Sequence, residues 1–409
     1  MKNKLNAQEL RWILYDVGNS AFVLLITTII PIFFNSLAEN DGISSVNYLA
    51  YWGYTASIVT IIVAVIGPIL GTISDHKGLK GPIFLISILI GCIGCVFLGF
   101  ASNWMVFLLI FIVAKVGYSL SLIFYDSMLS DITTEDRMDE VSAKGYAWGY
   151  IGSCVPFVLC LAIALGYEKI GISFSLAMKI IFVINAIWWL GMSIPLLRNY
   201  KQIHYVERVK NVISNSFGRI GHTLKNVKKD KKVFLFLLAF FCYIDGVYTI
   251  IDMATAYGSA MGLDTTGLLL ALLVTQIVAF PCAIIFGNLS SRYEGSKLIK
   301  ICILAYLCIA IFAVFLRYQW QFWMLAIFVG MFQGGIQALS RSYYTKIIPK
   351  EQSGEYFALM DICGKGASFI GTALVGAVAQ ITGSINIGVS SLVVMFALGL
   401  IFMFNAEKE

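Results

Sequence analysis

Long apolar runs recur along the 409-residue chain and leave only short polar segments between them. A helix needs about 20 mainly apolar residues to cross a bilayer. The pattern predicts twelve such helices, six on each side of a polar segment at 198–232. Their ranges are 12–36, 48–73, 82–101, 104–128, 140–165, 173–197, 233–257, 266–290, 298–316, 320–345, 354–379 and 384–404. The expected fold is therefore that of an all-α integral membrane protein.

Composition and charge support this class. Hydrophobic residues make up 59% of the chain and charged residues 13%, about half the charged fraction of a globular domain. Lys and Arg concentrate at the N-terminus, in the even-numbered loops and in the central polar segment, so both termini are expected in the cytoplasm. This bias also explains the net charge of +6 without a nucleic-acid partner. The first apolar run shows no signal-peptide cleavage site and should remain as a membrane helix.

An internal repeat divides the chain. Residues 132–153 align without a gap with residues 347–368, so that Glu140 matches Glu355 and Gly149 matches Gly364. The repeat predicts two pseudo-symmetric six-helix bundles, 1–197 and 233–409. The basic linker at 198–232 has apolar residues every three or four positions, which predicts an amphipathic helix on the membrane surface. A plain solvated linker is the alternative.

Polar residues inside the apolar runs mark a candidate site. A charged side chain at mid-bilayer costs about 2.5–3.5 kcal/mol on insertion scales, so it is expected to face a cavity or a partner. These residues fall mainly on the first, fourth, seventh and tenth predicted helices, with additions from the eleventh. That period fits four three-helix units around a water-filled cavity. The candidate substrate or ion-binding residues are Asp16, Asn19, Lys115, Tyr118, Asp126, Asp245, Tyr248, Gln333, Gln337, Arg341, Asp361 and Lys365.

Several of these residues have a structural alternative. Asp16 lies one turn inside its helix and could belong to a hydrated helix end, and Lys115 could form an interhelical ion pair. Asp361 and Lys365 are spaced to neutralise each other. Arg341 is different, because the repeat matches its position to Asp126. We expect Arg341 to pair with Asp126 or Asp16 and to close the cytoplasmic side of the cavity.

The turn after the second predicted helix, GTISDHKGLKGP, carries a second kind of signal. Gly71 allows close helix approach, Gly78 permits an unusual turn conformation, and Lys80 completes the G-x-x-x-D-x-x-G-x-K pattern. Asp75 can face the positive N-terminal end of a neighbouring helix. We therefore expect conformational machinery here and not a substrate ligand. The matching loop at 287–297 has Ser291 in place of the Asp and one inserted residue.

These features resemble the major facilitator superfamily, whose signature loop is the Gly71 to Lys80 pattern. More narrowly, LYDVGNSAF, FYDSMLSDI, YIDGV, QGGIQALSRSYYTKIIPK and GKGASFIG resemble the family of autophagy-related vacuolar amino-acid effluxers and their bacterial relatives. The chain departs from that family at Val17, Gly18 and Ile244, and Asp126 stands where Asn is usual. The resemblance implies a bacterial-type member in the plasma membrane, a secondary transporter that works by alternating access and exports amino acids or related small polar solutes.

The residues are compatible with that function. Side chains of both signs suit a zwitterionic substrate, coupled to a proton or sodium gradient, with membrane lipids as the surroundings and a monomer as the expected state. A carrier of lipid-like or drug-like molecules is one alternative, and a receptor or scaffold that does not transport is another. The three His residues lie in predicted loops and no hydrolase, zinc or P-loop motif is present, so neither an enzyme nor a metal cofactor is expected. Cys92 and Cys95 form a CxxC inside an apolar run, where a redox role is not expected.

Overall fold

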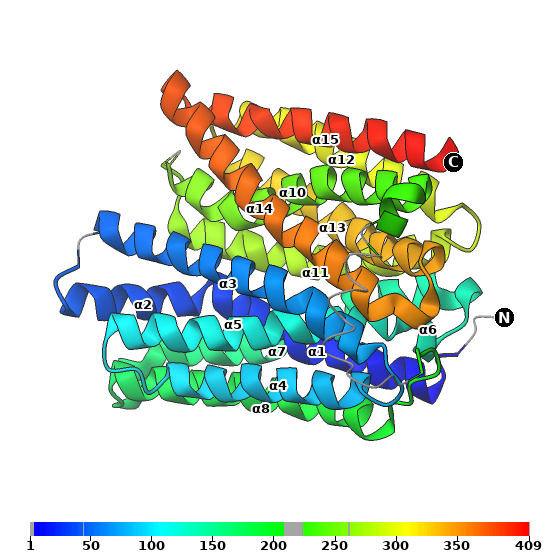
Figure 1. Ribbon diagram of the computed structural model, residues 1–409. Coiled ribbons are helices and arrows are strands. Elements are labelled where there is room, and N and C mark those ends of the chain that lie inside the picture. Colours follow the sequence, from blue (N-terminus) through cyan, green and yellow to red (C-terminus); the bar gives the residue numbers. More distant parts are fainter. Residues whose placement is uncertain (1–3, 44, 208–222, 224, 261, 409) are drawn as a thin grey trace.

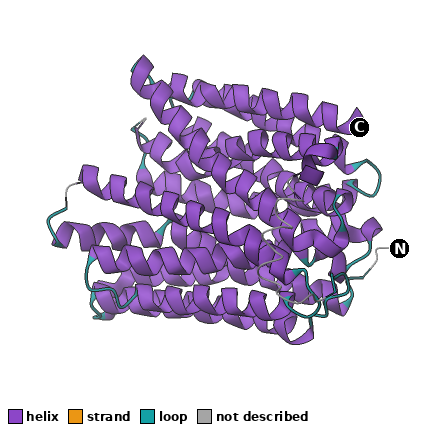
Figure 2. Cartoon of the chain, viewed as in Figure 1, coloured by secondary structure: helices purple, strands orange, loops and turns teal. Residues whose placement is uncertain are grey.

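The computed structural model describes residues 4–43, 45–207, 223, 225–260 and 262–408. Within these ranges a helix covers each predicted span (Figures 1 and 2). The long helices are α1 (Ala7–Thr27), α2 (Ile29–Asn40), α3 (Ser45–Ser74), α4 (Lys80–Leu98), α5 (Trp104–Ser127), α7 (Met138–Ile170), α8 (Phe174–Asn199), α10 (Lys231–Ala260), α11 (Thr265–Leu289), α12 (Gly295–Val314), α13 (Gln319–Ile347), α14 (Ser353–Thr382) and α15 (Ile385–Lys408). Three single turns join some of them: α6 (Leu129–Ile132), η1 (Glu135–Arg137) and η2 (Lys350–Gln352).

The first predicted span differs from the structure in one respect, because two helices share it. The chain leaves the helical conformation at Thr28, and α2 begins at the next residue. Pro31 explains the break, since a proline has no N–H for the carbonyl four residues earlier and its ring clashes with that carbonyl. At the other end, Asn6 and Glu9 form a capping box, which starts α1 earlier than hydropathy indicates.

The helices form two groups, which we call the N-terminal half (α1–α8) and the C-terminal half (α10–α15). Helix α1 packs against α7 and α8, and α10 packs against α14 and α15. Between the halves, α7 contacts α11 and α13, while α3 and α5 contact α14. This is the predicted two-bundle fold. The division of the chain at residues 197 and 233 stays a prediction, and the linker helix falls mainly outside the described residues.

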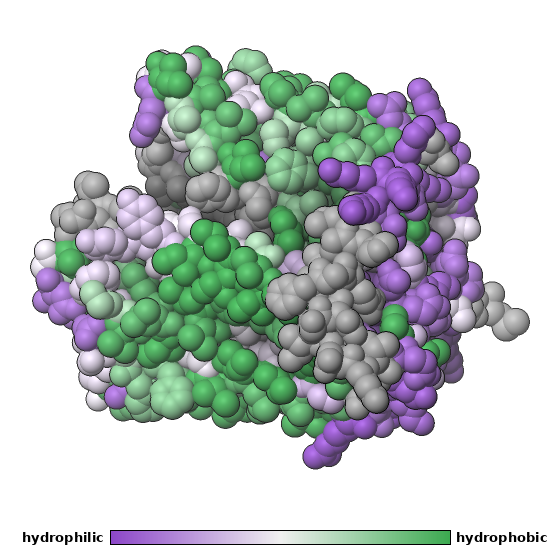
Figure 3. All heavy atoms as spheres, viewed as in Figure 1, coloured by the Kyte–Doolittle hydropathy of each residue, from purple (hydrophilic) through white to green (hydrophobic). Residues whose placement is uncertain are grey.

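Both chain ends lie at the same end of the bundle, which we call the terminal end (right in Figure 1). The halves meet along this end and diverge at the opposite end, where α2 and α3 stand apart from α14 and α15. A broad apolar surface covers much of the face shown in Figure 3, and hydrophilic residues gather at the terminal end. Among the described residues, 11 helices are long and apolar enough to cross a membrane, and the apolar stretch Ile370–Thr382 of α14 is shorter.

Candidate transport site and terminal-end closure

Arg341 of α13 is held by acidic residues of the other half. Its Nη1 lies 3.0 Å from Asp126 Oδ1, and its Nη2 lies 3.4 Å from Asp16 Oδ2. Ser142 of α7 accepts two further hydrogen bonds, one at its hydroxyl (2.9 Å) and one at its carbonyl (3.0 Å). Only 3% of the Arg341 side chain is exposed. The predicted ion pair is therefore present, and Arg341 contacts both acids instead of one.

Three aromatic rings complete the enclosure of this guanidinium. Its central carbon lies 4.4 Å from the ring centre of Tyr146, 4.5 Å from Trp12 and 5.4 Å from Tyr125. Tyr125 also donates a hydrogen bond of 2.8 Å to Asp16. Cation–π contacts of this kind contribute about 0.5–2 kcal/mol each, with the larger values in desolvated places. The rings therefore add to the binding of a cation that the carboxylates already neutralise.

The close approach depends on a glycine of α7. A Cβ on Gly145 would lie 2.6 Å from Asp16 Oδ2 and 3.1 Å from Arg341 Nη2. Any larger residue would separate these groups. Two candidate residues that precede Arg341 on α13 also face inward, since Gln333 is buried and Gln337 is half-buried.

The ion pairs of Arg341 are expected to matter for stability. Removing one partner of a buried ion pair typically costs about 3–5 kcal/mol, because the other charge is left without compensation.

Asp75 forms a second contact between the halves at the terminal end. Its carboxylate accepts hydrogen bonds from the backbone N–H groups of Gly354 (2.8 Å) and Glu355 (3.0 Å), in the first turn of α14. The N-terminal N–H groups of a helix lack partners within the helix and carry partial positive charge, so a carboxylate is a suitable acceptor. The prediction that Asp75 faces a helix N-terminus is confirmed.

The other residues of the loop support this contact. Lys80 is fully buried, lies 3.6 Å from Asp75 and donates a hydrogen bond of 2.8 Å to Ser353 at the start of α14. A Cβ on Gly71 would lie 2.5 Å from the Gly354 carbonyl oxygen. Gly78 has a φ of 72°, a conformation that other residues rarely adopt. Each glycine of the pattern thus has a structural reason.

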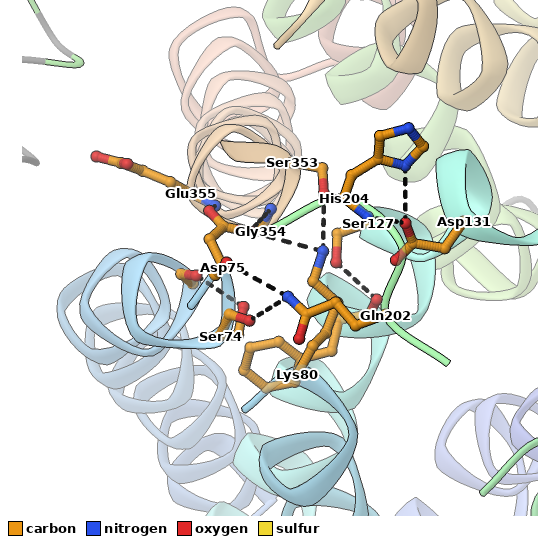
Figure 4. A network of polar contacts seen from close by, with 12 residues as sticks. Ser74, Asp75, Lys80, Ser127, Asp131, Gln202, His204, Ser353, Gly354 and Glu355 are labelled. Carbon is orange, nitrogen blue, oxygen red and sulfur yellow. Dashed lines mark hydrogen bonds and ion pairs between the residues drawn. The ribbon is translucent and has the colours of Figure 1, made fainter. Parts of the chain in front are cut away.

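A segment that the sequence analysis treated as linker lies across this loop (Figure 4). We call residues 200–207 the strap. The Gln202 side chain donates to the carbonyls of Ser74 (3.1 Å) and Asp75 (3.3 Å) and accepts from the Gly78 N–H (2.8 Å). The Val206 N–H donates to the Asp75 carbonyl (2.8 Å). The strap therefore holds the backbone of the residue whose carboxylate binds α14.

The strap is also fixed to α6. Asp131 accepts from the Tyr200 hydroxyl (2.6 Å) and from the His204 backbone (2.9 Å), and the His204 Nδ1 lies 2.9 Å away. Burial alone would raise the pKa of Asp131, but the hydrogen bonds from His204 and Tyr200 and the nearby Lys80 lower it. Asp131 is therefore ionised and links α6, the strap and the Asp75 loop.

Ion pairs nearer the surface add to the contact. Lys346 lies 2.7 Å from Asp139, and Lys350 lies 3.5 Å from Glu135. The Lys346–Asp139 pair joins the end of α13 to the start of α7, and the Lys350–Glu135 pair joins η2 to η1. Lys350 and Glu135 are both partly exposed, so solvent and salt screen their pair, whereas Lys346 is partly exposed and its partner Asp139 is buried.

The remaining site candidates lie near Arg341 or in other contacts. Asn19 donates to Asp16 (3.3 Å), and the Lys115 ammonium lies 4.8 Å from the Tyr118 ring centre. Asp361 lies within electrostatic range of Tyr118 and Asp126, and Tyr248 lies within range of Tyr118. The side chain of Lys365 lies outside the described residues, so the predicted pair with Asp361 stays a prediction.

Asp245 occupies a contact of its own between α10 and α14. Its Oδ1 accepts from the Gly371 backbone N–H (3.1 Å) and from Thr249 (3.4 Å). The residue is fully buried, and within the described part of the chain its Oδ2 has no hydrogen-bond partner. The contact with α14 is thus observed, and the expected place of Asp245 in the cavity stays a prediction.

A small cavity lies between the halves above the Arg341 cluster, on the side away from the terminal end. Its volume is about 20 Å³, room for about one water molecule, and it is lined by Leu24, Thr28, Phe157, Leu272, Leu273 and Gln276. These residues come from the end of α1, the break before α2, and from α7 and α11. The lining is mainly apolar with two polar groups.

Comparisons with known proteins agree with this architecture. The family model described as "Vacuole effluxer Atg22 like" matches residues 6–409. The uncharacterized MFS-type transporter YxiO of Bacillus subtilis (strain 168) is 41% identical over 414 residues, covering 100% of this chain and 97% of that protein. Autophagy-related protein 22-1 of Sclerotinia sclerotiorum is 26% identical over 66% of this chain, which spans about half (50%) of that protein's length.

Solved structures show the same fold at low sequence identity. The human organic anion transporter MFSD10 superposes with a TM-score of 0.74 at 10% identity, covering 98% of this chain and 100% of that chain. The transporter FucP in its outward conformation superposes with a TM-score of 0.72 at 15% identity, covering 98% of each chain. The chain has the fold of MFS transporters and belongs to the Atg22-like vacuole effluxer family.

Proposed function

We propose that the protein is a secondary transporter working by alternating access, and that this structure is the state closed at the terminal end. One observation carries the proposal: Arg341 of the C-terminal half is enclosed by carboxylates, rings and a backbone carbonyl of the N-terminal half. A contact of this kind across two halves can exist only while they are together. Its rupture would open the terminal end.

The terminal end is assigned to the cytoplasm by the positive-inside rule. Among the described residues, this end carries the basic side chains of several loops, including Lys77, Arg137, Lys346 and Lys350. The state described here would then face the outside of the cell. The proposed location is the bacterial plasma membrane, in line with the Bacillus relative.

The proposed substrate is a small polar or zwitterionic solute such as an amino acid, moved outward and driven by a proton or sodium gradient. Support comes from the effluxer family and from the acidic and basic groups that meet near Arg341. A carrier of amphiphiles is a second candidate, favoured by the mainly apolar lining of the cavity. A scaffold without transport activity would instead keep the terminal end permanently closed.

A thermal-shift screen of the purified protein tests the substrate class. The panel contains amino acids, peptides, nucleosides, sugars and lysolipids. We expect saturable stabilisation by members of the amino-acid group, because a ligand that binds only the folded state raises its stability. Ligands that stabilise are then tested for uptake into proteoliposomes with and without a pH or sodium gradient. Stabilisation by lysolipids alone would favour the amphiphile carrier. If none of the stabilising ligands is taken up, either with or without a gradient, the result would contradict transport.

A further inference from the structure

The groups around Arg341 form a binding site for a cation that belongs entirely to the N-terminal half. We call this set the cation cage: Trp12, Asp16, Tyr125, Asp126, Ser142 and Tyr146. The members come from α1, α5 and α7, whereas the cation they hold comes from α13. If the halves separate at the terminal end, Arg341 leaves with its own half and the cage remains assembled on the other.

We propose that the vacated cage binds an organic cation with a guanidinium or primary amine group. The inference rests on the alternating-access function proposed above and narrows its substrate class to cationic solutes. Departure of Arg341 leaves two carboxylates without their cation in a largely buried place. Buried charges without partners are costly, so a replacement cation from the cytoplasm would be bound favourably.

The chemistry of the cage favours an organic cation over a metal ion. Four acceptor atoms face the guanidinium nitrogens, at 3.4 Å from Asp16, 3.0 Å from Asp126 and 2.9 and 3.0 Å from Ser142. They match the several N–H donors of a planar guanidinium. Hard metal ions take six or more oxygen ligands, which three aromatic rings in the same shell would displace. The rings instead favour a weakly hydrated cation.

Binding and closure would then exclude each other. The ligand and Arg341 use the same acceptors, so an occupied cage would favour the state open at the terminal end, and the return of Arg341 would displace the ligand from the cage. A ligand shifts a conformational equilibrium only through such a difference in affinity between the states. The cage is thus a cytoplasmic loading site that closure empties.

The direct test is chemical rescue of Arg341→Ala. Agmatine and methylguanidinium chloride are titrated against the purified variant, with sodium chloride at the same ionic strength as the comparison. We expect a saturable rise in melting temperature, about 2 °C at ten times the dissociation constant, with no matching rise for sodium. The Asp16→Asn/Arg341→Ala double variant should lose the effect. Arg292→Ala is the matched control, because Arg292 is an exposed arginine in the connection between α11 and α12.

Equal stabilisation by sodium chloride, or a response of the Arg292→Ala control, would indicate a general salt effect and overturn the proposal. A second measurement uses the intact gate, in case Arg341→Ala does not fold. Spin labels are placed at Asp136 and Glu351, exposed positions in the matching connections η1 and η2, in a cysteine-free background. Agmatine should increase the population with the longer label distance.

The two failures are distinguishable with these labels. If a long-distance population exists but agmatine does not change it, the cation cage proposal is wrong while alternating access stands. If no long-distance population is found under any condition, the proposed function itself fails. If agmatine raises the long-distance population and Asp126→Asn abolishes that rise, both the cation cage proposal and alternating access are supported.

Discussion

The loops that join α3 to α4 and α11 to α12 occupy matching positions in the two halves, but among the described residues only the first makes a buried polar contact with the opposite half. In the α3–α4 loop, Asp75 and Lys80 are fully buried and bind the start of α14. In the α11–α12 loop, Ser291 is exposed and its hydroxyl donates to the Asn288 carbonyl of its own helix (2.7 Å). A surface hollow beside it is lined by Ile285, Asn288, Leu289, Ser291 and Arg292.

The glycine contact survives in both loops. A Cβ on Gly287 would lie 2.6 Å from the Ala143 Cβ, as Gly71 approaches Gly354 on the other side. What differs is the charge. One side of the closed end is joined by a buried carboxylate on a helix N-terminus, and the other by the part-exposed pairs of Lys346 and Lys350. The two sides should therefore respond very differently to mutation and to salt.

Asp75→Asn should have the largest effect. The substitution removes the charge that two α14 N–H groups and buried Lys80 share, and loss of one partner of a buried pair costs about 3–5 kcal/mol. We expect a strong decrease in melting temperature or a shift of the Asp136–Glu351 label distance toward the open state. Glu135→Gln, which affects the exposed pair with Lys350, is the control and should change both readouts far less. Equal effects of the two variants would contradict the asymmetry.

The two glycines sharpen the comparison next. Gly71→Ala places a Cβ within 3.2 Å of three atoms of α14, two of them in the Gly354 carbonyl, whereas Gly287→Ala places one that near only the Ala143 methyl group, at 2.6 Å. Overpacking typically costs about 1–3 kcal/mol. We expect Gly71→Ala to weaken closure of the terminal end more than Gly287→Ala does, measured by the same labels. A larger effect of Gly287→Ala would contradict the tighter contact between the halves at Gly71.

Gln202→Ala tests whether the strap supports the Asp75 loop. The change removes three hydrogen bonds, each contributing about 0.5–1.5 kcal/mol, with the lower values expected where water can replace them. Melting temperature should fall by an amount between those of the glycine and surface variants. Lys201→Ala, an exposed neighbour in the same strap, is the matched control. If Lys201→Ala lowers the melting temperature as much as Gln202→Ala, the contacts of the strap have no specific role.

Lys350→Gln should have the smallest effect, because Lys350 and its partner Glu135 are both partly exposed. Exposed ion pairs contribute about 0–1 kcal/mol and weaken with salt. We expect a small change in the label distances at low ionic strength that disappears at about 0.5 M salt. Persistence of the change at high salt would place the Lys350–Glu135 pair among the contacts that hold the end closed.

Much of this arrangement could be predicted from the sequence, for a physical reason. Charges inside apolar helices are costly, so Arg341, Asp126 and Asp16 stood out, and the repeat indicated which of them could meet. Asp75 stood out because its loop pattern fits a helix N-terminus. Trp12, Tyr125 and Tyr146 were missed, since aromatic residues in an apolar helix do not differ from core or lipid-facing ones by sequence. Spacing could not show that Asp245 points toward α14.

The strap was missed for a different reason. Residues 200–207 follow the last helix of the first half, and their mixed polar composition is that of a connecting segment. Their contacts are with backbone groups of a loop more than a hundred residues away, and hydrogen bonds to backbone leave no pattern in side-chain type. Asp131 was only weakly recognisable from the sequence, as an acidic residue just beyond the polar end of a helix.

The distance between spin labels at Asp136 and Glu351 tests the central claim most directly, without any knowledge of the substrate. It is measured in proteoliposomes for the otherwise unchanged protein and for Arg341→Gln, which leaves the cage without its cation. The ion pair of Arg341 with Asp16 and Asp126 predicts mainly one short distance in the first and a second, longer population in the variant. The same single short distance in both proteins would contradict the claim that Arg341 closes the terminal end.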